Sequence, residues 1–451
     1  MNTKALRQKI LDLAIHGKLV PQDPNDEPAS VLIERIRAEK ERLIKEGKIK
    51  RPKKTKTTSD KPHYPYQLPE GWVWCKLDDY VLSVTDGDHQ APPKSSNGVP
   101  FLVISNIATW KIDFTNTRYV PKEYYENINE DRKAKRGDIL FSVTGSYGIV
   151  VNVKTDQEFC FQRHIGLIKP VIGKEYLSYI LMSGYIKGLC DNLATGTAQK
   201  TVGLDTLRSF FIPIAPIQEQ KRIVAKIKQL LLVTTALECG KNELQTAIKQ
   251  VKSKILDLAI HGKLVPQDPT DEPAAELLKR INPKAEITCD NGHYQKLPKG
   301  WAVCQLDSII SYEQPTPYIV KSTDYDDTYT TPVLTAGKSF IIGHTNETNG
   351  IYEKLPCIIF DDFTTDSKLV DFPFKVKSSA MKILQVKEDI NIEYIAMFMS
   401  ITRLISDTHK RYWISEYSKI EIPIPPQNEQ DRIVKNVRLL LSRLDGIIEN
   451  L

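Results

Sequence analysis

The sequence KILDLAIHGKLVPQDPNDEPA at residues 9–29 returns as KILDLAIHGKLVPQDPTDEPA at residues 254–274. Twenty of the 21 positions are identical, and only Asn25, which corresponds to Thr270, differs. Apolar residues at helical spacing lead into His-Gly, and glycine commonly follows the last turn of a helix. The prolines that come next cannot continue a helix. Each copy therefore predicts a helix end followed by a rigid turn, built twice in one chain.

Two further motifs are also doubled. LPEGWVWCKLDD at 68–79 matches LPKGWAVCQLDS at 297–308, and IPIAPIQEQKRIV at 212–224 matches IPIPPQNEQDRIV at 422–434. The two blocks between these motifs have similar lengths but strongly different interiors. Short β-rich runs separated by Gly, Pro, Asn and Asp predict several strands and a few short helices in each block. Shared borders with divergent contents indicate two modules of one fold with different binding surfaces.

Between the blocks, apolar residues recur at alternating steps of four and three from residue 223 to residue 258. This spacing predicts one long helix with a coiled-coil seam. The same register returns at residues 433–451 and, briefly, near the N-terminus. The predicted seam residues are Ile223, Ile227, Leu230, Leu237, Leu244, Ile248, Val251, Ile255, Leu258, Ile433, Val437, Leu440, Leu444 and Ile447.

The terminal helices match the two halves of the central helix in a circular order. The C-terminal segment corresponds to its first half and the N-terminal segment to its second half. The seam could pair separate copies of the chain, but the chain already contains a partner for its own seam, which favours self-pairing. We therefore predict an α+β protein with two globular mixed α/β domains. Long antiparallel coiled-coil helices separate these domains, in a pseudo-two-fold arrangement with a circular repeat.

Composition indicates a packed protein, with 41% hydrophobic and 26% charged residues among 451. The first 20 residues contain no signal-peptide pattern, no apolar run approaches a membrane span, and the seven cysteines form no C-x-x-C pair, so we expect a cytoplasmic protein. A net charge of +6 is compatible with an anionic partner such as DNA. Residues 48–61 hold seven basic side chains and one acid. We interpret them as a solvated linker, with a strap that contacts phosphates as the alternative.

Catalytic motifs do not emerge from the sequence. TAGKSF at 335–340 ends like a phosphate-binding loop, but proline stands at position 332, where that motif needs glycine. The acidic run IIFDDFTTDSKLVDF at 358–372 is too compressed for a metal site that joins two strands, and we interpret it as a polar loop. We predict no catalytic residues and no metal site.

The organisation of the chain resembles the specificity subunits of type I restriction–modification systems. The resemblance is carried by ILDLAIHGKLVPQDP at 10–24 and 255–269, by the LP-x-GW motifs and by the IPI-x-P…EQ-x-RIV motifs. It implies five regions: an N-terminal helical region with a basic linker at 1–61, a target recognition domain at 62–215, a central coiled-coil region at 216–292, a second recognition domain at 293–425 and a C-terminal helix at 426–451.

The resemblance also implies partners. In this family each recognition domain reads one half of a split double-stranded DNA target, and the helical regions bind two modification (methyltransferase) subunits. Restriction subunits complete the complex, and no membrane is involved. The chain itself needs no cofactor, whereas S-adenosylmethionine, ATP and Mg²⁺ serve the partner subunits. The alternative is an adapter that assembles methyltransferase subunits without reading DNA. A fused enzyme is disfavoured, because the blocks and helices account for the whole chain.

Base-reading residues have no fixed motif, so our candidates rest on chemistry. Arg and Lys suit guanine, Asn and Gln suit adenine, and Asp can accept from cytosine. A solvated surface or a bond that holds the fold is the alternative for each residue. The candidates in the first block are His89, Gln90, Lys94, Thr144, Ser146, Tyr147, Arg163, His164, Gln199 and Lys200. Those in the second are Gln314, Thr316, Tyr318, Lys321, Thr335, Lys338, Asp362, Thr364, Thr365, Lys368, Lys410, Arg411 and Tyr412.

Overall fold

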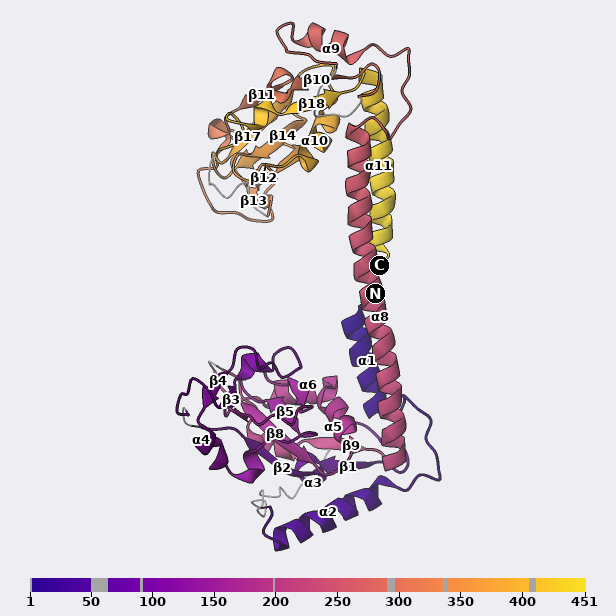
Figure 1. Ribbon diagram of the computed structural model, residues 1–451, viewed down its shortest axis with the longest axis vertical. Helices are drawn as coiled ribbons and strands as arrows, with labels where there is room; N and C mark the ends of the chain where they lie inside the picture. Colours follow the sequence, from indigo (N-terminus) through magenta and orange to yellow (C-terminus); the bar gives the residue numbers. More distant parts are fainter. Residues whose placement is uncertain are drawn as a thin grey trace. The chain divides into compact units, whose positions relative to one another are not determined.

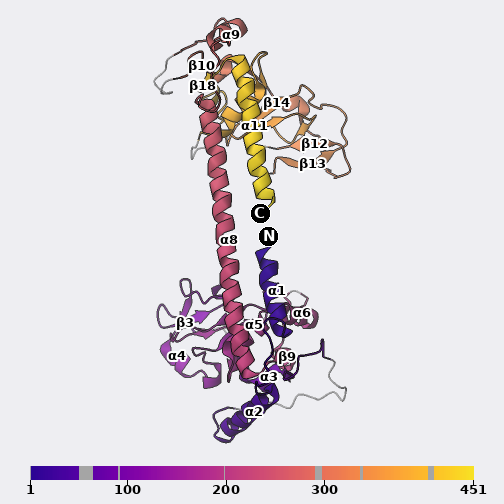
Figure 2. The same ribbon diagram turned by 90° about the vertical axis from the view of Figure 1, so that its right-hand side faces the viewer.

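The computed structural model describes residues 2–49, 64–89, 92–197, 199–289, 297–335, 339–404 and 411–451. The chain divides into two compact units, Met1–Gly240 and Lys241–Leu451, which Figures 1 and 2 show in two views. The long helix α8 (Ile217–Ile260) contributes its first half to unit 1 and its second half to unit 2. Most of the basic segment at 48–61 lies outside the described residues.

Unit 1 contains a mixed α/β block together with α1, α2 and the first half of α8. The helices are α1 (Thr3–Ile15), α2 (Ala29–Lys45), α3 (Leu77–Tyr80), α4 (Lys122–Glu126), α5 (Lys174–Leu181), α6 (Gly184–Leu193) and α7 (Leu204–Ser209). The strands are β1 (Val73–Lys76), β2 (Val81–Asp86), β3 (Val99–Leu102), β4 (Arg118–Val120), β5 (Ile139–Ser142), β6 (Val150–Asn152), β7 (Cys160–Phe161), β8 (Ile165–Pro170) and β9 (Phe211–Ile214).

Unit 2 is built in the same way. Its helices besides α8 are α9 (Ala274–Ile281), α10 (Ile392–Ile401) and α11 (Gln427–Glu449). Its strands are β10 (Ala302–Gln305), β11 (Ile310–Glu313), β12 (Thr331–Leu334), β13 (Ile341–Thr345), β14 (Cys357–Asp361), β15 (Ser367–Val370), β16 (Lys375–Val376), β17 (Met381–Val386) and β18 (Glu421–Ile424).

The strand order is the same in both units. Unit 1 has an antiparallel sheet β2-β8-β5-β6, and unit 2 has β11-β17-β14-β15. Each unit adds a three-stranded sheet, β4-β3-β7 or β13-β12-β16, with one antiparallel and one parallel pair. Each also closes its block with a two-stranded ribbon, β1-β9 or β10-β18. The prediction of two α+β modules with one fold is therefore confirmed.

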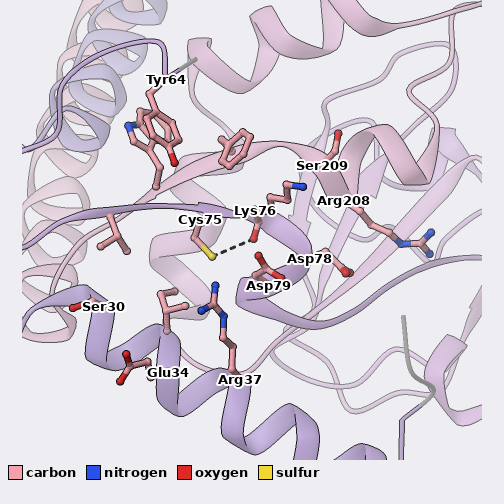
Figure 3. Close-up of a pocket in the computed structure, with 14 residues that line it drawn as sticks. Ser30, Glu34, Arg37, Tyr64, Cys75, Lys76, Asp78, Asp79, Arg208 and Ser209 are labelled. Atoms are coloured by element: carbon pink, nitrogen blue, oxygen red, sulfur yellow. Dashed lines mark hydrogen bonds between the residues drawn. The ribbon is translucent and has the colours of Figure 1, made fainter. Parts of the chain in front are cut away.

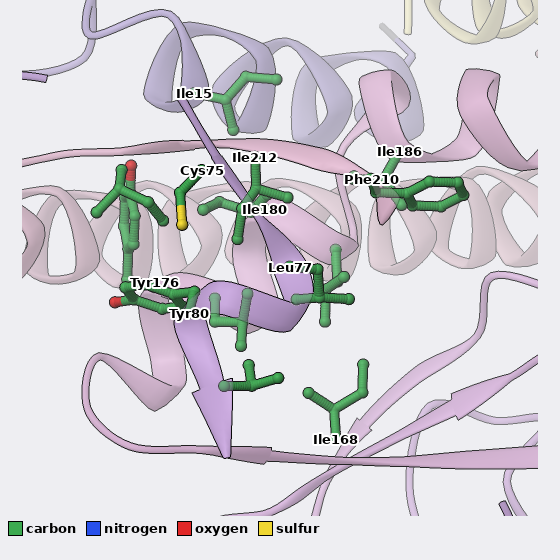
Figure 4. Close-up of a cluster of buried hydrophobic side chains, with 14 of the residues drawn as sticks. Ile15, Cys75, Leu77, Tyr80, Ile168, Tyr176, Ile180, Ile186, Phe210 and Ile212 are labelled. Atoms are coloured by element: carbon green, nitrogen blue, oxygen red, sulfur yellow. The ribbon is translucent and has the colours of Figure 1, made fainter. Parts of the chain in front are cut away.

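The main core of unit 1 joins the helices to the β1-β9 ribbon. Figure 4 shows Leu77 and Tyr80 of α3 facing Tyr176 and Ile180 of α5, with Ile212 of β9 among them. All five side chains are almost completely buried. Because α1 also contributes Ile10 and Ile15 to this cluster, the N-terminal helix is anchored to the recognition block. No helix in the described part of the chain is long and apolar enough to span a membrane.

Each terminal helix lies antiparallel to its half of α8. In unit 1, Arg7 of α1 forms an ion pair with Glu238 at 2.7 Å, whereas Gln22, which follows α1, bonds Glu219 near the start of α8. In unit 2, Lys252 forms an ion pair with Asp445, and Lys241 Nζ donates to Leu451 O at 3.1 Å. In each unit the residue numbers of the terminal helix rise as those of its contacts on α8 fall, so the two helices are antiparallel. The predicted self-pairing is therefore observed within each unit.

The seam is buried at the two ends of α8 and exposed near its middle. Ile223, Ile227, Ile248 and Ile255 are buried, as are Ile433 and Val437 of α11, while Leu230, Leu258, Leu440 and Leu444 are half-buried. Four predicted seam residues remain 40–46% exposed, namely Leu237, Leu244, Val251 and Ile447. The predicted coiled-coil seam is therefore buried only in part, because one partner helix covers each half of α8 and leaves the middle of α8 less covered.

The three doubled motifs meet in one cluster, which we call the junction. In unit 1 it consists of Gln22, Asp26, Trp72, Glu219 and Arg222. The Glu219 carboxylate is 1% exposed and accepts hydrogen bonds from Trp72 Nε1 at 2.9 Å and from Gln22 Nε2 at 3.0 Å. Arg222 pairs with Asp26 at 2.6 Å. Each motif thus supplies at least one partner in a connected polar network.

Unit 2 repeats the junction bond for bond, with Gln267, Asp271, Trp301, Glu429 and Arg432. Glu429 accepts from Trp301 at 3.1 Å and from Gln267 at 3.1 Å, and Arg432 pairs with Asp271 at 2.6 Å. Both tryptophans are buried. The repeat in the sequence is therefore a repeat of one physical contact.

The glycine in each copy of the His-Gly motif is required by geometry. Gly17 and Gly262 have φ of +65° and +63°, a conformation that favours glycine. A Cβ on Gly17 would lie 2.4 Å from Pro69 Cγ, and one on Gly262 would lie 2.3 Å from Pro298 Cγ. These prolines belong to the LP-x-GW motifs, so the helix end and the start of each block are in direct contact.

Replacing Trp72 with Phe is expected to destabilise the chain by about 1–3 kcal/mol, because a buried carboxylate loses a donor. Burial raises the pKa of Glu219, and the bonds from Gln22 and Trp72 oppose this rise. Without Trp72, the Glu219 carboxylate binds a proton more readily in the folded state. The loss of stability relative to wild type should therefore shrink as the pH falls from about 8 to about 5. Denaturant unfolding at both pH values measures this.

Trp74→Phe is the matched control, because the Trp74 indole donates to the neutral carbonyl of Tyr66 at 3.3 Å in a half-buried position. Its effect should be smaller and independent of pH. A Trp72→Phe loss that did not change with pH would show that packing, not the bond to the carboxylate, stabilises the junction.

Candidate nucleic-acid interface

A polar hollow of about 430 Å³ lies in unit 1 beyond the end of β2. Four separate segments of the sequence form it: the end of β2 with His89, the turn just beyond β5, the turn between β7 and β8, and the segment that leads into α7. Five of the predicted DNA-binding residues, His89, Thr144, Arg163, His164 and Gln199, line it together with Asp86, Val143, Thr201, Val202, Gly203 and Leu204. The tertiary structure thus gathers residues that the sequence offered only as separate stretches.

Main-chain bonds hold these segments together. Asp86 of β2 lies opposite Gly166 of β8, and Phe141 of β5 lies opposite the same glycine. Just beyond β5, Val143 N donates to His164 O at 2.9 Å and Val143 O accepts from Val202 N at 2.8 Å. Thr144 and Thr201 form a bridge. The hollow is therefore a surface of strand ends whose floor is held by main-chain hydrogen bonds.

The side chains of the hollow offer both donors and acceptors. The carboxylate of Asp86 lies 2.8 Å from His89 Nε2 and 3.4 Å from an Arg132 nitrogen. Arg163 is exposed and lies beside His164. Burial, and then the Arg163 charge, lower the pKa of His164, so this imidazole is neutral at physiological pH. A wall of mixed hydrogen-bonding groups suits recognition of base edges, which differ in their pattern of donors and acceptors.

Strand register identifies the equivalent surface in unit 2. In β14, Phe360 lies opposite Lys382, just as Phe141 of β5 lies opposite Gly166, so Lys382 is equivalent to Gly166. Asp86 of β2 also lies opposite Gly166. When the β11–β17 register is continued by one residue, Gln314 lies opposite Lys382 and is therefore equivalent to Asp86. Asp362 N donates to Ala380 O, and Asp362 O accepts from Tyr412 N, which repeats the two main-chain bonds of Val143.

The same register makes Phe363 and Arg411 equivalent to Thr144 and Thr201. The Arg411 guanidinium lies 5.9 Å from the centre of the Phe363 ring, and both side chains are exposed. The fold therefore presents Gln314, Phe363 and Arg411 at strand ends in unit 2, where unit 1 presents Asp86, Thr144 and Thr201.

The type I restriction–modification DNA specificity domain model matches residues 86–246 and 298–450, more than half of the chain. The chain belongs to this family. The EcoAI specificity subunit of Escherichia coli is 27% identical over 99% of this chain and 89% of its own length. The EcoR124I/EcoR124II specificity subunit, also from Escherichia coli, is 54% identical over 132 residues, which are 28% of this chain and 33% of that protein.

A solved chain from a study of complex assembly and conformational transition in a type I system shares the fold. The TM-score is 0.62 at 16% identity, over 86% of this chain and 94% of that chain. The family match confirms the predicted function, which is that of a type I specificity subunit. The chain is a specificity subunit, a non-catalytic part of a type I restriction–modification enzyme that recognises DNA targets within the complex.

The remaining candidates of the first recognition block lie outside the hollow. Lys94, Ser146 and Lys200 are exposed and free to contact a phosphate. Tyr147 is half-buried, donates to Asp191 at 2.9 Å and lies under the Lys187 ammonium at 4.3 Å. Gln90 lies outside the described residues.

In the second block of the specificity subunit, several candidates are exposed around the strand ends. Thr316, Lys321, Thr364 and Lys368 are exposed, while Tyr318 and Thr335 are half-buried. Tyr318 donates to Glu313 at 2.6 Å, Thr364 donates to Asp361 at 2.7 Å, and Lys368 lies 4.4 Å from the centre of the Phe340 ring. Lys338 and Lys410 fall outside the described residues.

Three predicted contacts in the second block are corrected by burial, whereas Thr144 in the first block is buried at 9% exposure but lines the hollow. Asp362 is 1% exposed, accepts from Trp413 N at 2.8 Å and pairs with the buried Lys382. Thr365 is completely buried, with a positive φ and a bond from Leu404 N at 3.1 Å. Tyr412 is 2% exposed. These side chains hold the fold beneath the surface, because none of them reaches solvent.

The sequence-based list missed Asp86, Thr201, Phe363 and Lys382. Asp86 and Thr201 fall within or beside stretches that we selected, TDGDHQAPPK and ATGTAQKT, but their polarity alone did not set them apart. Their equivalence to residues in the other block depends on strand register. The faint match of GDILFSVTG to PCIIFDDFT was the available signal, because it aligns β5 with β14.

A larger hollow of about 560 Å³ lies between α2 and the β1-β9 ribbon, and Figure 3 shows its mixed acidic and basic lining. Burial raises the pKa of its Cys75 to about 12, so the thiol stays protonated and is no nucleophile. None of the predicted DNA-binding residues lines it. Within the described ranges, no group of three or more His, Cys, Asp or Glu side chains is placed to hold a metal ion.

Arg163→Ala is expected to weaken binding of the assembled complex to its DNA about tenfold, because an exposed guanidinium in the hollow is lost. Arg35→Ala on α2 is the matched control: Arg35 is also exposed, pairs with Glu27 and leaves the same net charge when removed. The midpoint of thermal unfolding should change little in either variant. Equal loss of affinity in both variants would show that total charge, not the hollow, decides binding.

Proposed function

We propose that the two recognition blocks, residues 62–215 and 293–425, each read one half of a split DNA target. The observation that carries the proposal is the equivalence of their strand ends. The two blocks share strand order and main-chain bonds but place different side chains at corresponding positions, Asp86 in one and Gln314 in the other. One scaffold with two different reading surfaces is what a target with two different halves requires.

The chemistry supports DNA as the ligand. Lys94, Lys200, Lys321 and Lys368 are exposed in the two blocks and suit phosphate contacts, which supply sequence-independent affinity. Gln and Asp side chains at the strand ends suit base edges, which supply specificity.

The helical regions 1–61, 216–292 and 426–451 are the proposed scaffold. Since helices are stiff, a pseudo-two-fold arrangement of the two blocks along them would set the number of base pairs between the half-sites. We place the complex in the cytoplasm, with no membrane partner.

We also propose that each junction is a docking site for one modification subunit. Two identical subunits need the same surface twice, and the junction repeats the same side-chain contacts in both units. Lys18 and Lys263 are exposed next to it. Restriction subunits join the assembly, and S-adenosylmethionine, ATP and Mg²⁺ serve these partner subunits. Structural capping of the helix is the competing explanation for the repeat.

Sequencing of methylated positions in a host that carries the complete system should give a split recognition sequence. Exchange of residues 293–425 for the equivalent block of another family member should alter one half-site and leave the other unchanged. A change in both half-sites would contradict the modular reading, and no methylated split sequence in the wild type would favour an adapter that does not read DNA.

The double variant Lys18→Glu/Lys263→Glu is expected to lose both modification subunits, and each single variant to lose one, because each charge reversal affects one docking site. The mass of the purified complex measures the number of bound subunits. Lys154→Glu/Lys321→Glu, which alters two exposed lysines of the recognition blocks, is the control and should retain two subunits. Retention of two subunits by the junction variant would leave capping as the explanation of the repeat.

A further inference from the structure

A buried ion pair lies directly beneath the second reading surface. The ammonium of Lys382 lies 3.5 Å from Asp362 Oδ2, and both side chains are 2% exposed. Asp362 is fixed in turn by the main-chain N–H of Trp413 at 2.8 Å. The Lys382 ammonium also lies 5.5 Å from the centre of the Tyr312 ring, which further restricts it. A lysine at this depth is held in one position.

Lys382 determines the orientation of Gln314. Its ammonium donates to Gln314 Oε1 at 3.2 Å, and because a lysine ammonium has only donors, the atom that faces it must be the carbonyl oxygen. Gln314 is exposed, so its other branch, the amide nitrogen, is the one directed away from the buried pair. Within the described part of the chain this nitrogen has no acceptor, so both of its N–H groups are available.

Stability alone does not explain this arrangement. A buried ion pair contributes little net stability, since desolvation of the two charges offsets their attraction. The first recognition block has Gly166 at the position of Lys382 and forms the same sheet without the pair. The feature that distinguishes the second block is the oriented glutamine at its surface.

The two blocks thus present opposite hydrogen-bonding groups at one equivalent position. Asp86, which is 9% exposed at the floor of the hollow, is an acceptor whose oxygens lie near His89 and Arg132. Gln314 is a carboxamide whose acceptor is turned inward and whose donors are turned outward. Donors and acceptors on base edges are what distinguish base pairs in the major groove.

We propose that Lys382, held by Asp362, is a positioning residue that fixes Gln314 with its N–H donors towards DNA. Gln314 then selects a base with a keto oxygen, guanine O6 or thymine O4, at one position of the second half-site. This inference rests on the proposed function, since it requires residues 293–425 to read a half-site.

The test compares methylated sequences in hosts that carry the full chain with its partner subunits. In Gln314→Glu, one carboxylate oxygen remains with Lys382 and the other faces outward as an acceptor. The preferred base at one position of the second half-site should therefore change to one with an amino group, cytosine or adenine. The discrimination should change about ten- to a hundredfold, the range of one well-placed base contact.

The double variant Lys382→Met/Asp362→Asn removes both charges without leaving one buried alone, and the introduced carboxamide oxygen can still accept from Trp413 N. It should relax discrimination at that same position and leave the rest of the half-site intact. Gln250→Glu, the same chemical change at an exposed position of α8, is the control and should leave the target unchanged.

The outcomes separate this inference from the proposed function. An unchanged half-site in Gln314→Glu, with a split target still methylated, would overturn the role of Gln314 and leave the modular function in place. A changed base preference in Gln314→Glu combined with an unchanged target in the double variant would overturn the positioning role of Lys382. Absence of any split target in the wild type would instead overturn the proposed function.

Discussion

A buried carboxylate with two donors is the constraint on which each half of the molecule depends. Glu219 and Glu429 are 1% exposed, and an unpaired charge at such depth would be strongly destabilising. In each unit a tryptophan and a glutamine satisfy it from segments far away in the sequence. The helix end, the start of the recognition block and the start of the following helix must therefore come together, which links three motifs that sequence alone shows only as separate repeats.

This constraint explains which parts of the chain are alike and which differ. The junction combines a buried carboxylate that has two donors with an ion pair beside it, so a change in one member leaves another unsatisfied. The glycines add a second limit, because Pro69 and Pro298 occupy the space where a Cβ would lie. At the strand ends the main-chain bonds carry the fold, and side chains such as Asp86 or Gln314 can differ between the blocks without breaking them.

In each block, a framework of strands that the two blocks share carries a surface whose side chains differ between them. Buried strands such as β5 and β14 supply apolar side chains to the cores, and the turns beyond them supply the polar groups. In the second block one layer of this surface is itself supported by a buried charge pair, Lys382 with Asp362. A specificity subunit gains from such support, since recognition requires a side chain to present one hydrogen-bonding face consistently.

The sequence was enough to predict the two α+β modules, the helices that pair within the chain, the helix ends at Gly17 and Gly262, and the family. These features depend on local periodicity and on repeated motifs, which are visible without coordinates. Which polar residues share a surface became clear only from the fold. It brought His89, Thr144, Arg163, His164 and Gln199 together and placed Asp362, Thr365 and Tyr412 inside. The physical reason is strand register: a polar residue beyond a strand faces solvent or the core according to main-chain pairing with distant segments, and composition does not encode that pairing.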